Sequence, residues 1–386
     1  DLVNRIIQEN LTAVRVVKAY VRGAYETDKF EKVNTNLQTQ SERAFKLATT
    51  NMAAMQFVMY GTIISILWFG GGMIRVGAMQ VGELTGFLSY VLQILNSLMM
   101  ISNIFLMLTR SLASGKRIME VLDEEIDITE DKARDIEVTK GEVEFRHVYF
   151  KYKKEAPEYV LSDINLHIRP GETVGIVGQT GSAKTTLVQL IPRLYDITSG
   201  ELLIDGRPVE EYPLKNLRDA VAVVLQKNTL FSGTLRENLL WGDSSASREE
   251  IEEACRTAGA DEFIGRLEQG YDTEMGQGGV KLSGGQKQRL CIARAILKKP
   301  KVLILDDSTS AVDTPTEVDI RERLAERLPH MTKIIIAQRI SSVRHAGQIV
   351  VLDDGRVQGV GTHEELLAGN KIYREIYESQ KEGADL

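Results

Sequence analysis

The chain has 386 residues, of which 43% are hydrophobic, and its formal net charge is −7. This length allows two or three domains. The negative charge argues against a nucleic-acid partner, because nucleic-acid-binding proteins present a basic surface to the phosphate backbone. The two cysteines, Cys255 and Cys291, match no metal-ligand spacing and are most simply buried thiols in a reducing compartment.

The first third of the chain contains two long stretches without a charged residue, at 47–74 and 84–109. Each exceeds the roughly 20 residues that a helix needs to cross a bilayer. Basic residues gather before the first stretch and after the second, so the positive-inside bias places both ends in the cytoplasm. We therefore predict that residues 1–121 are a partial, multi-pass transmembrane domain in a lipid bilayer. Two long buried helices of a soluble protein are the alternative.

Two boundaries are indicated by the sequence. The chain starts with Asp1 in the middle of a helical pattern and shows no signal peptide, so we expect a fragment whose N-terminal part is missing. Residues 122–140 are predicted to be an acidic linker, because they are rich in carboxylates and their first part lacks an apolar period. A soluble domain is then expected over 141–386.

This soluble domain alternates between short apolar segments and helical patterns, which is typical of an α/β fold with a parallel sheet. Helices are expected at 185–194, 249–267 and 292–298. Strands are expected at 142–150, 160–168, 173–177, 201–204, 221–225, 302–305 and 334–337, with a closing hairpin at 349–357.

A phosphate-binding loop is predicted at residues 175–186, GIVGQTGSAKTT, between an apolar strand and a helix. Gly178 and Gly181 let the backbone turn its N–H groups toward an anion. Lys184 supplies positive charge for the β- and γ-phosphates, and the Thr185 hydroxyl can bind Mg²⁺. A glycine-rich turn without a ligand is the alternative. The predicted nucleotide-binding residues here are Gly178, Gln179, Thr180, Gly181, Ser182, Ala183, Lys184, Thr185 and Thr186.

Two carboxylates, Asp306 and Asp307, follow the apolar segment 302–305. A strand at the core of a parallel sheet delivers its C-terminal end to the ligand edge. We therefore expect Asp306 to hold Mg²⁺ and Asp307 to face the attacking water.

The sequence LSGGQ at 282–286 resembles the signature of ATP-binding cassette (ABC) proteins, and the whole chain resembles an ABC exporter subunit. The resemblance implies a RecA-like P-loop ATPase domain with a helical subdomain at about 227–298. It also implies that the membrane hairpin corresponds to the last two transmembrane helices of an exporter. Residues 11–34 resemble the cytoplasmic loop that carries a coupling helix, which in such exporters usually contacts the partner subunit's nucleotide domain.

The resemblance also implies roles in binding MgATP. Tyr152 matches the aromatic residue that stacks on adenine, with a plain strand-edge tyrosine as the alternative. Gln226 matches the glutamine that touches Mg²⁺ or water and links to the membrane domain. The implied metal ligands are therefore Thr185, Gln226 and Asp306.

The signature residues are implied to act on a second subunit. In this family they bind the γ-phosphate of ATP held by the opposite chain, and Asp313 matches the loop that crosses the dimer interface. The Gly-Gly pair suits a close backbone approach to phosphate at a helix start. The signature positions are Leu282, Ser283, Gly284, Gly285 and Gln286.

Three residues depart from the family pattern. Asp307 replaces a catalytic Glu, Gln338 replaces a switch His, and Ala183 replaces the last Gly of the phosphate loop. The Asp307 carboxylate retreats by about 1.5 Å, one carbon–carbon bond. Loss of a general base costs on the order of 10²–10⁴-fold in rate. Gln338 can donate a hydrogen bond to the γ-phosphate but cannot become cationic as His can.

These departures lead to our functional prediction, in which the degenerate catalytic positions are Asp307, Gln338 and Gln226. The chain is expected to be one subunit of a heterodimeric exporter in a cell membrane, which the resemblance implies to be bacterial, with its nucleotide domain in the cytoplasm. Its own site would bind ATP and Mg²⁺ and hydrolyse slowly, while its signature completes the site of a non-identical partner. The substrate would be a small molecule, a lipid or a peptide. A homodimer, with two slow sites or with ordinary ATPase activity, a soluble ABC ATPase and a regulator of a membrane pathway are the alternatives.

Overall fold

The computed structural model describes residues 2–276, 279, 282–306 and 314–382. The chain divides into two compact units, Asp1–Glu125 and Ile126–Leu386. The division lies within the predicted linker at 122–140. Each unit is described below by itself.

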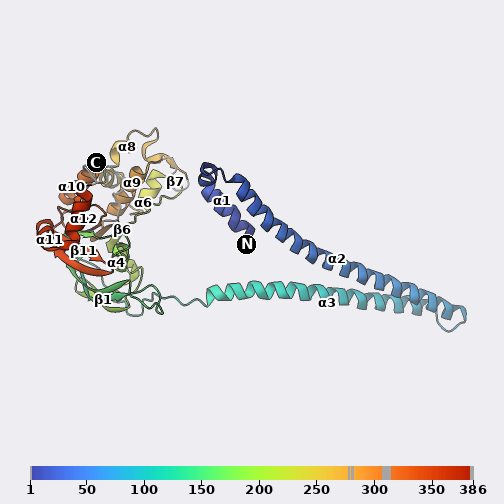
Figure 1. Ribbon diagram of the computed structural model, residues 1–386. Helices are drawn as coiled ribbons and strands as arrows, with labels where there is room; N and C mark the ends of the chain where they lie inside the picture. Colours follow the sequence, from blue (N-terminus) through green and yellow to red (C-terminus); the bar gives the residue numbers. More distant parts are fainter. Residues whose placement is uncertain (1, 277–278, 280–281, 307–313, 383–386) are drawn as a thin grey trace. The chain divides into compact units, whose positions relative to one another are not determined.

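The first unit consists of three helices, α1 (Leu2–Ala19), α2 (Gly23–Arg75) and α3 (Val81–Leu122). In Figure 1, α1 folds back along the start of α2. The two helices are joined by an ion pair between Lys29 Nζ and a Glu9 carboxylate oxygen at 3.1 Å, and by the buried side chain of Ile6. The turn between them exposes Tyr20 and Val21, whose fractional exposures are 75% and 87%.

Helices α2 and α3 form an antiparallel hairpin that closes at residues 76–80 (Figure 1). Close packing begins at Gly70, where a Cβ would lie 2.3 Å from Leu84 Cδ1, so a larger residue there would require the Leu84 side chain to move. Gln80 and Glu83 form a capping box that starts α3. The loop therefore has a defined geometry that brings the two helices together.

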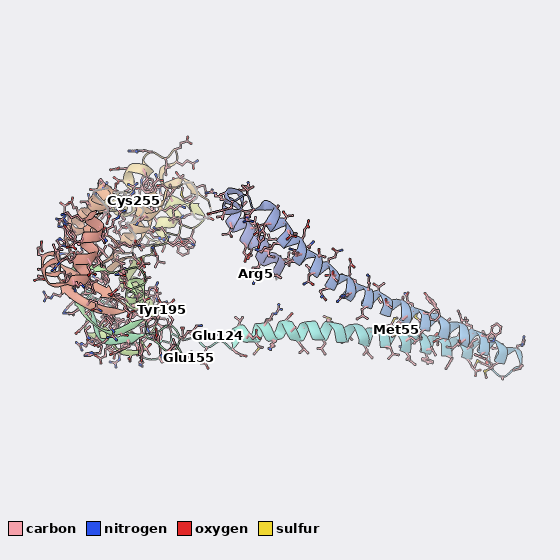
Figure 2. The ribbon with its side chains drawn as sticks, viewed as in Figure 1. Arg5, Met55, Glu124, Glu155, Tyr195 and Cys255 are labelled. Carbon is pink, nitrogen blue, oxygen red and sulfur yellow. The ribbon has the colours of Figure 1, made fainter. Side chains whose placement is uncertain are left out.

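Both helices of the hairpin, α2 and the Val81–Ile101 part of α3, contain an 18-residue window that is apolar enough to cross a membrane. Only 6% of the most apolar window of each is buried within the described chain. Figure 2 shows side chains projecting from both helices along their length, with Met55 on α2. Large apolar side chains such as Phe57 and Trp68 are exposed, which is unlike the core helices of a soluble protein.

The second unit contains a six-stranded sheet in the order β12-β11-β3-β10-β9-β6 and a four-stranded antiparallel sheet in the order β2-β1-β4-β5. Within the six-stranded sheet, only the β11–β12 edge pair is antiparallel. The strands are β1 (Val143–Phe150), β2 (Leu161–Ile168), β3 (Thr173–Val177), β4 (Ser199–Ile204), β5 (Arg207–Pro208), β6 (Val221–Val224), β9 (Val302–Asp306), β10 (Thr332–Ile336), β11 (Gln348–Asp353) and β12 (Arg356–Gly361).

Helices cover both faces of the six-stranded sheet, and each face has its own apolar core. One core joins this sheet to α4 (Lys184–Leu190), α5 (Leu214–Ala220) and the antiparallel sheet. The other core joins it to the remaining helices. Those helices are α6 (Leu235–Leu240), α7 (Arg248–Thr257), α8 (Asp261–Ile264), α9 (Gly284–Leu297), α10 (Thr314–Arg327), α11 (His363–Gly369) and α12 (Lys371–Glu382), and a short ribbon of β7 (Gly233–Thr234) and β8 (Glu274–Met275) lies among them.

Figure 1 shows α6, α8 and α9 at the end of this unit opposite β1. The helix expected at 249–267 is two helices, α7 and α8, because Gly259 between them takes a φ of 64°, in the left-handed region that ends α-helices. Helix α4 ends at Leu190, four residues earlier than expected. The strands lie close to their predicted positions, and β3 has the predicted bounds.

The second half of the acidic segment 122–140 belongs to the second unit and packs on its core. The Arg134 backbone N–H donates to the Glu211 carbonyl at 2.8 Å, and Asn216 donates its side-chain amide to the Ile136 carbonyl at 3.0 Å. Val138 is buried in the core beside the antiparallel sheet. This part of the segment is thus fixed to the domain that it precedes.

Candidate nucleotide-binding site

The phosphate loop connects the buried strand β3 to helix α4. Gly178 lies so close to β11 that a Cβ on it would be 2.0 Å from the Leu352 carbonyl oxygen. The Lys184 ammonium donates to the carbonyls of Gly178 and Gln179, at 2.8 and 2.7 Å, and to Ser182 Oγ at 3.2 Å. The loop therefore wraps around the one cation that the sequence assigns to the β- and γ-phosphates.

Ala183 stands at the N-cap of α4 with φ 70° and ψ 23°, in the left-handed region. An L-residue with a Cβ pays roughly 1–2 kcal/mol in that region, whereas glycine does not. The Ala183 side chain packs against the core on the α4 side of the sheet. The backbone thus keeps the shape that glycine would favour, at a cost in strain.

Thr185 and Asp306 meet at the end of the sheet. The Thr185 hydroxyl, in the first turn of α4, donates to Asp306 Oδ1 at 3.0 Å, and Asp306 is almost fully buried at the end of β9. A hydroxyl and a carboxylate are oxygen ligands of the kind that Mg²⁺ prefers, with phosphates and waters completing the shell. No cluster of three His, Cys, Asp or Glu residues that could hold a metal occurs in the described part of the chain. The donor set fits Mg²⁺ carried by a nucleotide rather than an all-protein metal centre.

The parallel register brings the remaining predicted residues to the same edge. In β10, Ile336 is level with Ile176 of β3 and with Asp306 of β9. Gln338 follows two residues later, as Gly178 follows Ile176. Gln226 follows β6, whose Val224 is level with Leu305. Both glutamines lie at the carboxyl edge of the sheet, beyond the ends of their strands.

Two predicted residues lie outside the described part of the chain. They are Asp307, at the position of the catalytic Glu, and Asp313, at the position of the interface loop.

Tyr152 lies just beyond β1 beside the phosphate loop. Its hydroxyl hydrogen-bonds with Thr186 Oγ1 at 2.9 Å, and half of its surface is exposed. Phe150 and Tyr195 both meet its ring edge-on, with centroids 4.9 and 5.0 Å away. These contacts fix the ring plane, so Tyr152 offers a rigid aromatic surface within reach of the phosphate loop.

Tyr195, labelled in Figure 2, contacts Tyr152 but is not among the site residues that the sequence predicts. It follows α4 by five residues, and nothing in the local pattern distinguishes it from a surface tyrosine. Its place beside the site follows from its ring contacts with Tyr152 and Phe150, with centroids 5.0 and 5.8 Å away.

The signature residues form the start of α9. Ser283 is the N-cap, and its Oγ accepts from the Gln286 backbone N–H at 3.3 Å. The Gln286 side chain accepts from the Ser283 backbone N–H at 2.9 Å, which completes a capping box. Leu282 is buried in the core of the helical part, whereas Ser283 and Gly284 are exposed. The signature is therefore anchored on one side and open on the other.

Both cysteines are buried, as predicted. Burial raises the pKa of the Cys255 thiol to about 12, and burial also raises the pKa of Cys291. Thiols with such values are protonated near neutrality and are poor nucleophiles. They contribute packing rather than chemistry.

Two family profiles match the chain. The profile described as "ABC transporter transmembrane region" matches residues 1–98, and the profile described as "ABC transporter" matches residues 161–310. The second match includes the phosphate loop, the signature and Asp306.

Relatives cover almost the whole chain. An uncharacterized ABC transporter ATP-binding protein of Bacillus subtilis, YfiB, is 43% identical over 387 residues, which span 100% of this chain and 67% of the relative. A putative multidrug export ATP-binding/permease protein of Staphylococcus aureus is 40% identical over 98% of this chain and 65% of its own length.

A solved structure, that of a bacterial Atm1-family ABC exporter with ATP bound, aligns with a TM-score of 0.86 at 31% identity. It covers 97% of this chain and 66% of the exporter. The chain thus spans about two thirds of the length of the proteins that it resembles.

Proposed function

Because this chain belongs to the ABC transporter family, with a transmembrane region and an ATP-binding domain in one polypeptide, we propose that it is one subunit of a dimeric, ATP-driven exporter. The observation that carries the proposal is the arrangement of the Lys184, Thr185 and Asp306 side chains. It places a cation, a hydroxyl and a carboxylate at one edge of a parallel sheet, where they would hold MgATP. When bound there, Mg²⁺ would neutralise charge on the β- and γ-phosphates.

The membrane unit supports a place in a cell membrane. Two apolar helices flank the short loop at 76–80, and the basic residues of this unit lie at the other ends of the hairpin, except for Arg75 beside the loop. We propose a multi-pass protein of a bacterial membrane with the nucleotide domain in the cytoplasm. The exposed Tyr20 and Val21 at the α1–α2 turn are then available to contact the nucleotide domain of the partner subunit.

The chain's own site is proposed to hold ATP and to hydrolyse it slowly. Lys184, Thr185 and Asp306 retain the binding groups. Hydrolysis needs a base near the attacking water and a group that stabilises the γ-phosphate, and here those positions carry Asp307 and Gln338. The shorter carboxylate and the neutral amide both weaken catalysis more than they weaken binding.

The signature is proposed to complete the ATP site of a second, non-identical subunit. Ser283 and Gly284 are exposed at the start of α9, and the capping box holds them in place. A helix N-terminus with a serine hydroxyl and two glycines suits the γ-phosphate of a nucleotide held by another chain. The catalytic contribution of this chain would then be made mainly outside its own site.

Substrate class follows from the relatives only in outline. The Staphylococcus aureus relative is named as a putative multidrug exporter, so we propose a small-molecule, lipid or peptide substrate.

The test is to purify the full-length protein alone and with its partner, and to trap nucleotide in the complex after incubation with MgATP. We expect slow turnover alone, fast turnover in the complex, and unhydrolysed ATP retained by this chain. Rapid steady-state hydrolysis by this chain alone would contradict the asymmetric assembly and support a homodimer.

A linked variant separates the two catalytic positions. Asp307→Glu restores the longer carboxylate but leaves Gln338 in place, so we expect it not to restore full turnover. A fully active homodimer of the Asp307→Glu protein would show that the residue at 338 does not limit hydrolysis.

A further inference from the structure

The C-terminal helix α12 contacts the loop that carries Gln338. The Gln380 side chain donates from Nε2 to the Gln338 backbone carbonyl at 2.7 Å. Its Oε1 accepts from the Ile340 backbone N–H at 2.9 Å. One side-chain amide therefore binds two backbone groups, 42 and 40 residues away in the sequence.

The chemistry of this contact explains why a glutamine suits it. In an extended chain, the carbonyl of one residue and the N–H of the residue two positions later point to the same side. A side-chain amide carries one acceptor and donor hydrogens in one plane, as a peptide unit does. Gln380 thus takes the place of a neighbouring strand beyond the end of β10 and fixes the direction of the chain at 338–340.

Both partners of the contact are firmly placed. Tyr373 anchors α12, because its ring is fully buried and its hydroxyl hydrogen-bonds with His363 Nδ1 at 2.8 Å. On the loop side, Ile340 is buried. Arg321 of α10 donates to the carbonyls of Ser341 and Ser342. The loop after β10 is therefore held from α12 and from α10.

We propose that Gln380 is a positioning residue for ATP. By fixing the backbone of residues 338–340, it directs the Gln338 side chain toward the γ-phosphate and makes the C-terminal helix part of the nucleotide site. This inference rests on the proposed function, in which Gln338 faces the γ-phosphate. It predicts a specific loss when Gln380 is changed: recognition of ATP weakens, and recognition of ADP, which lacks a γ-phosphate, does not.

The experiment uses the full-length transporter with its partner and a photoreactive azidoadenine nucleotide. Because adenine is expected on Tyr152, the label attaches to this chain, and gel separation reports its site alone. Competition by MgATP and by MgADP then gives both affinities. We expect Gln380→Ala to weaken MgATP about tenfold, the order of one hydrogen bond to a charged group. We expect MgADP to stay within about twofold of the unmodified protein, a change under about 0.4 kcal/mol.

Three further variants exclude a general structural effect and calibrate the loss. Gln380→Glu keeps the acceptor for Ile340 but has no donor for Gln338, and we expect the same loss for MgATP at an unchanged melting temperature. Glu378→Ala, at an exposed position on the same helix, is the matched control and should change neither affinity. Gln338→Ala calibrates the effect and should weaken MgATP at least as much.

The inference is overturned if Gln380→Glu binds MgATP like the unmodified protein, or if both nucleotides weaken equally. It is also overturned if Gln338→Ala leaves the preference for ATP unchanged, because nothing would then need positioning. Failure of the proposed asymmetric assembly is a separate result. It would appear as rapid turnover of this chain alone, whatever the nucleotide preference.

Discussion

Two helices of the nucleotide domain begin at a predicted phosphate site, and they begin in different ways. Helix α9 starts with Ser283, whose hydroxyl and backbone N–H form a reciprocal capping box with Gln286. Helix α4 starts with Ala183, which has no side-chain oxygen and stands in the left-handed region. The signature helix is capped by its own side chains, whereas the helix of the phosphate loop has no side-chain cap.

The difference indicates where each helix obtains the stability of its first turn. An N-cap side chain contributes typically about 1 kcal/mol. At α9 this contribution comes from the chain's own side chains, so we expect the helix start to form before a partner's ATP arrives. At α4 the corresponding stabilisation would come from the phosphates, and ligand binding then adds to the stability of the folded domain. We therefore expect the stability of the phosphate loop to depend on bound nucleotide. The stability of the signature should be independent of it.

Removal of the cation of the phosphate loop should have the largest effect. Lys184→Ala deletes the ammonium that the loop encloses. We expect affinity for MgATP to fall about 100-fold, since one or two hydrogen bonds to charged groups are lost. Azidoadenine labelling of this chain measures the loss.

Lys154→Ala, at an exposed lysine beyond β1, is the control for loss of a positive charge and should bind MgATP normally. If Lys184→Ala bound MgATP normally, the predicted phosphate loop would not be a phosphate site, and the comparison between α4 and α9 would no longer hold.

The cap of the signature helix can be tested by a pair of serines. Ser283→Ala should lower the turnover of the complex at least about tenfold, because the hydroxyl and the fixed helix start are both lost, while ATP binding by this chain is unchanged. Ser247→Ala is a closely matched control, since Ser247 forms the same capping box with Glu250 at the start of α7.

Both serine variants should lose about 1 kcal/mol of stability, and only Ser283→Ala should lose turnover. ATPase assays and melting temperatures of the two complexes measure this. Equal turnover of the two variants would mean that the signature serves only as a helix cap.

Replacing Ala183 with glycine should have a smaller effect. Its sign should be opposite to that of the same replacement at an ordinary helix position. Ala183→Gly relieves the left-handed backbone and should stabilise the nucleotide domain by about 1 kcal/mol. Ala325→Gly, on the exposed face of α10, should destabilise it by about the same amount. Denaturant titration of the full-length protein, followed through the nucleotide domain, measures both changes. A loss of stability in Ala183→Gly would show that packing of the Ala183 methyl group outweighs the strain.

Much of the nucleotide domain could be predicted from sequence because its signals are local. The run of apolar residues gave β3 its bounds, and the glycines and Lys-Thr pair marked the phosphate loop. The meeting of Thr185 with Asp306 follows from the parallel arrangement of the strands, which places their ends at one edge. The membrane hairpin was recognisable from the absence of charge alone.

Other features could not be predicted because they depend on contacts between distant residues. Tyr195 meets Tyr152 only through the folding of the antiparallel sheet against α4. Gln380 binds the backbone at Gln338, and nothing near Gln380 in the sequence indicates it. The break at Gly259 was missed because the apolar pattern continues through the turn. Side-chain contacts with remote backbone groups leave no periodicity to detect.

The smallest effect is expected at Cys291, which lies on α9 and reports whether this helix is formed without nucleotide. Its side chain is buried, and burial raises the pKa of its thiol. In a Cys255→Ser background, maleimide labelling at pH 8 should be slow and should change less than about twofold on addition of MgATP. The labelling rate should still be rising with pH beyond the ordinary pKa of a cysteine, because the thiolate forms only near the raised value. The denatured protein supplies the rate of the accessible thiol. A different result would be rapid labelling without nucleotide that slows with MgATP. It would mean that α9, like α4, needs its ligand to complete its first turn, and the proposed difference between the two helices would be wrong.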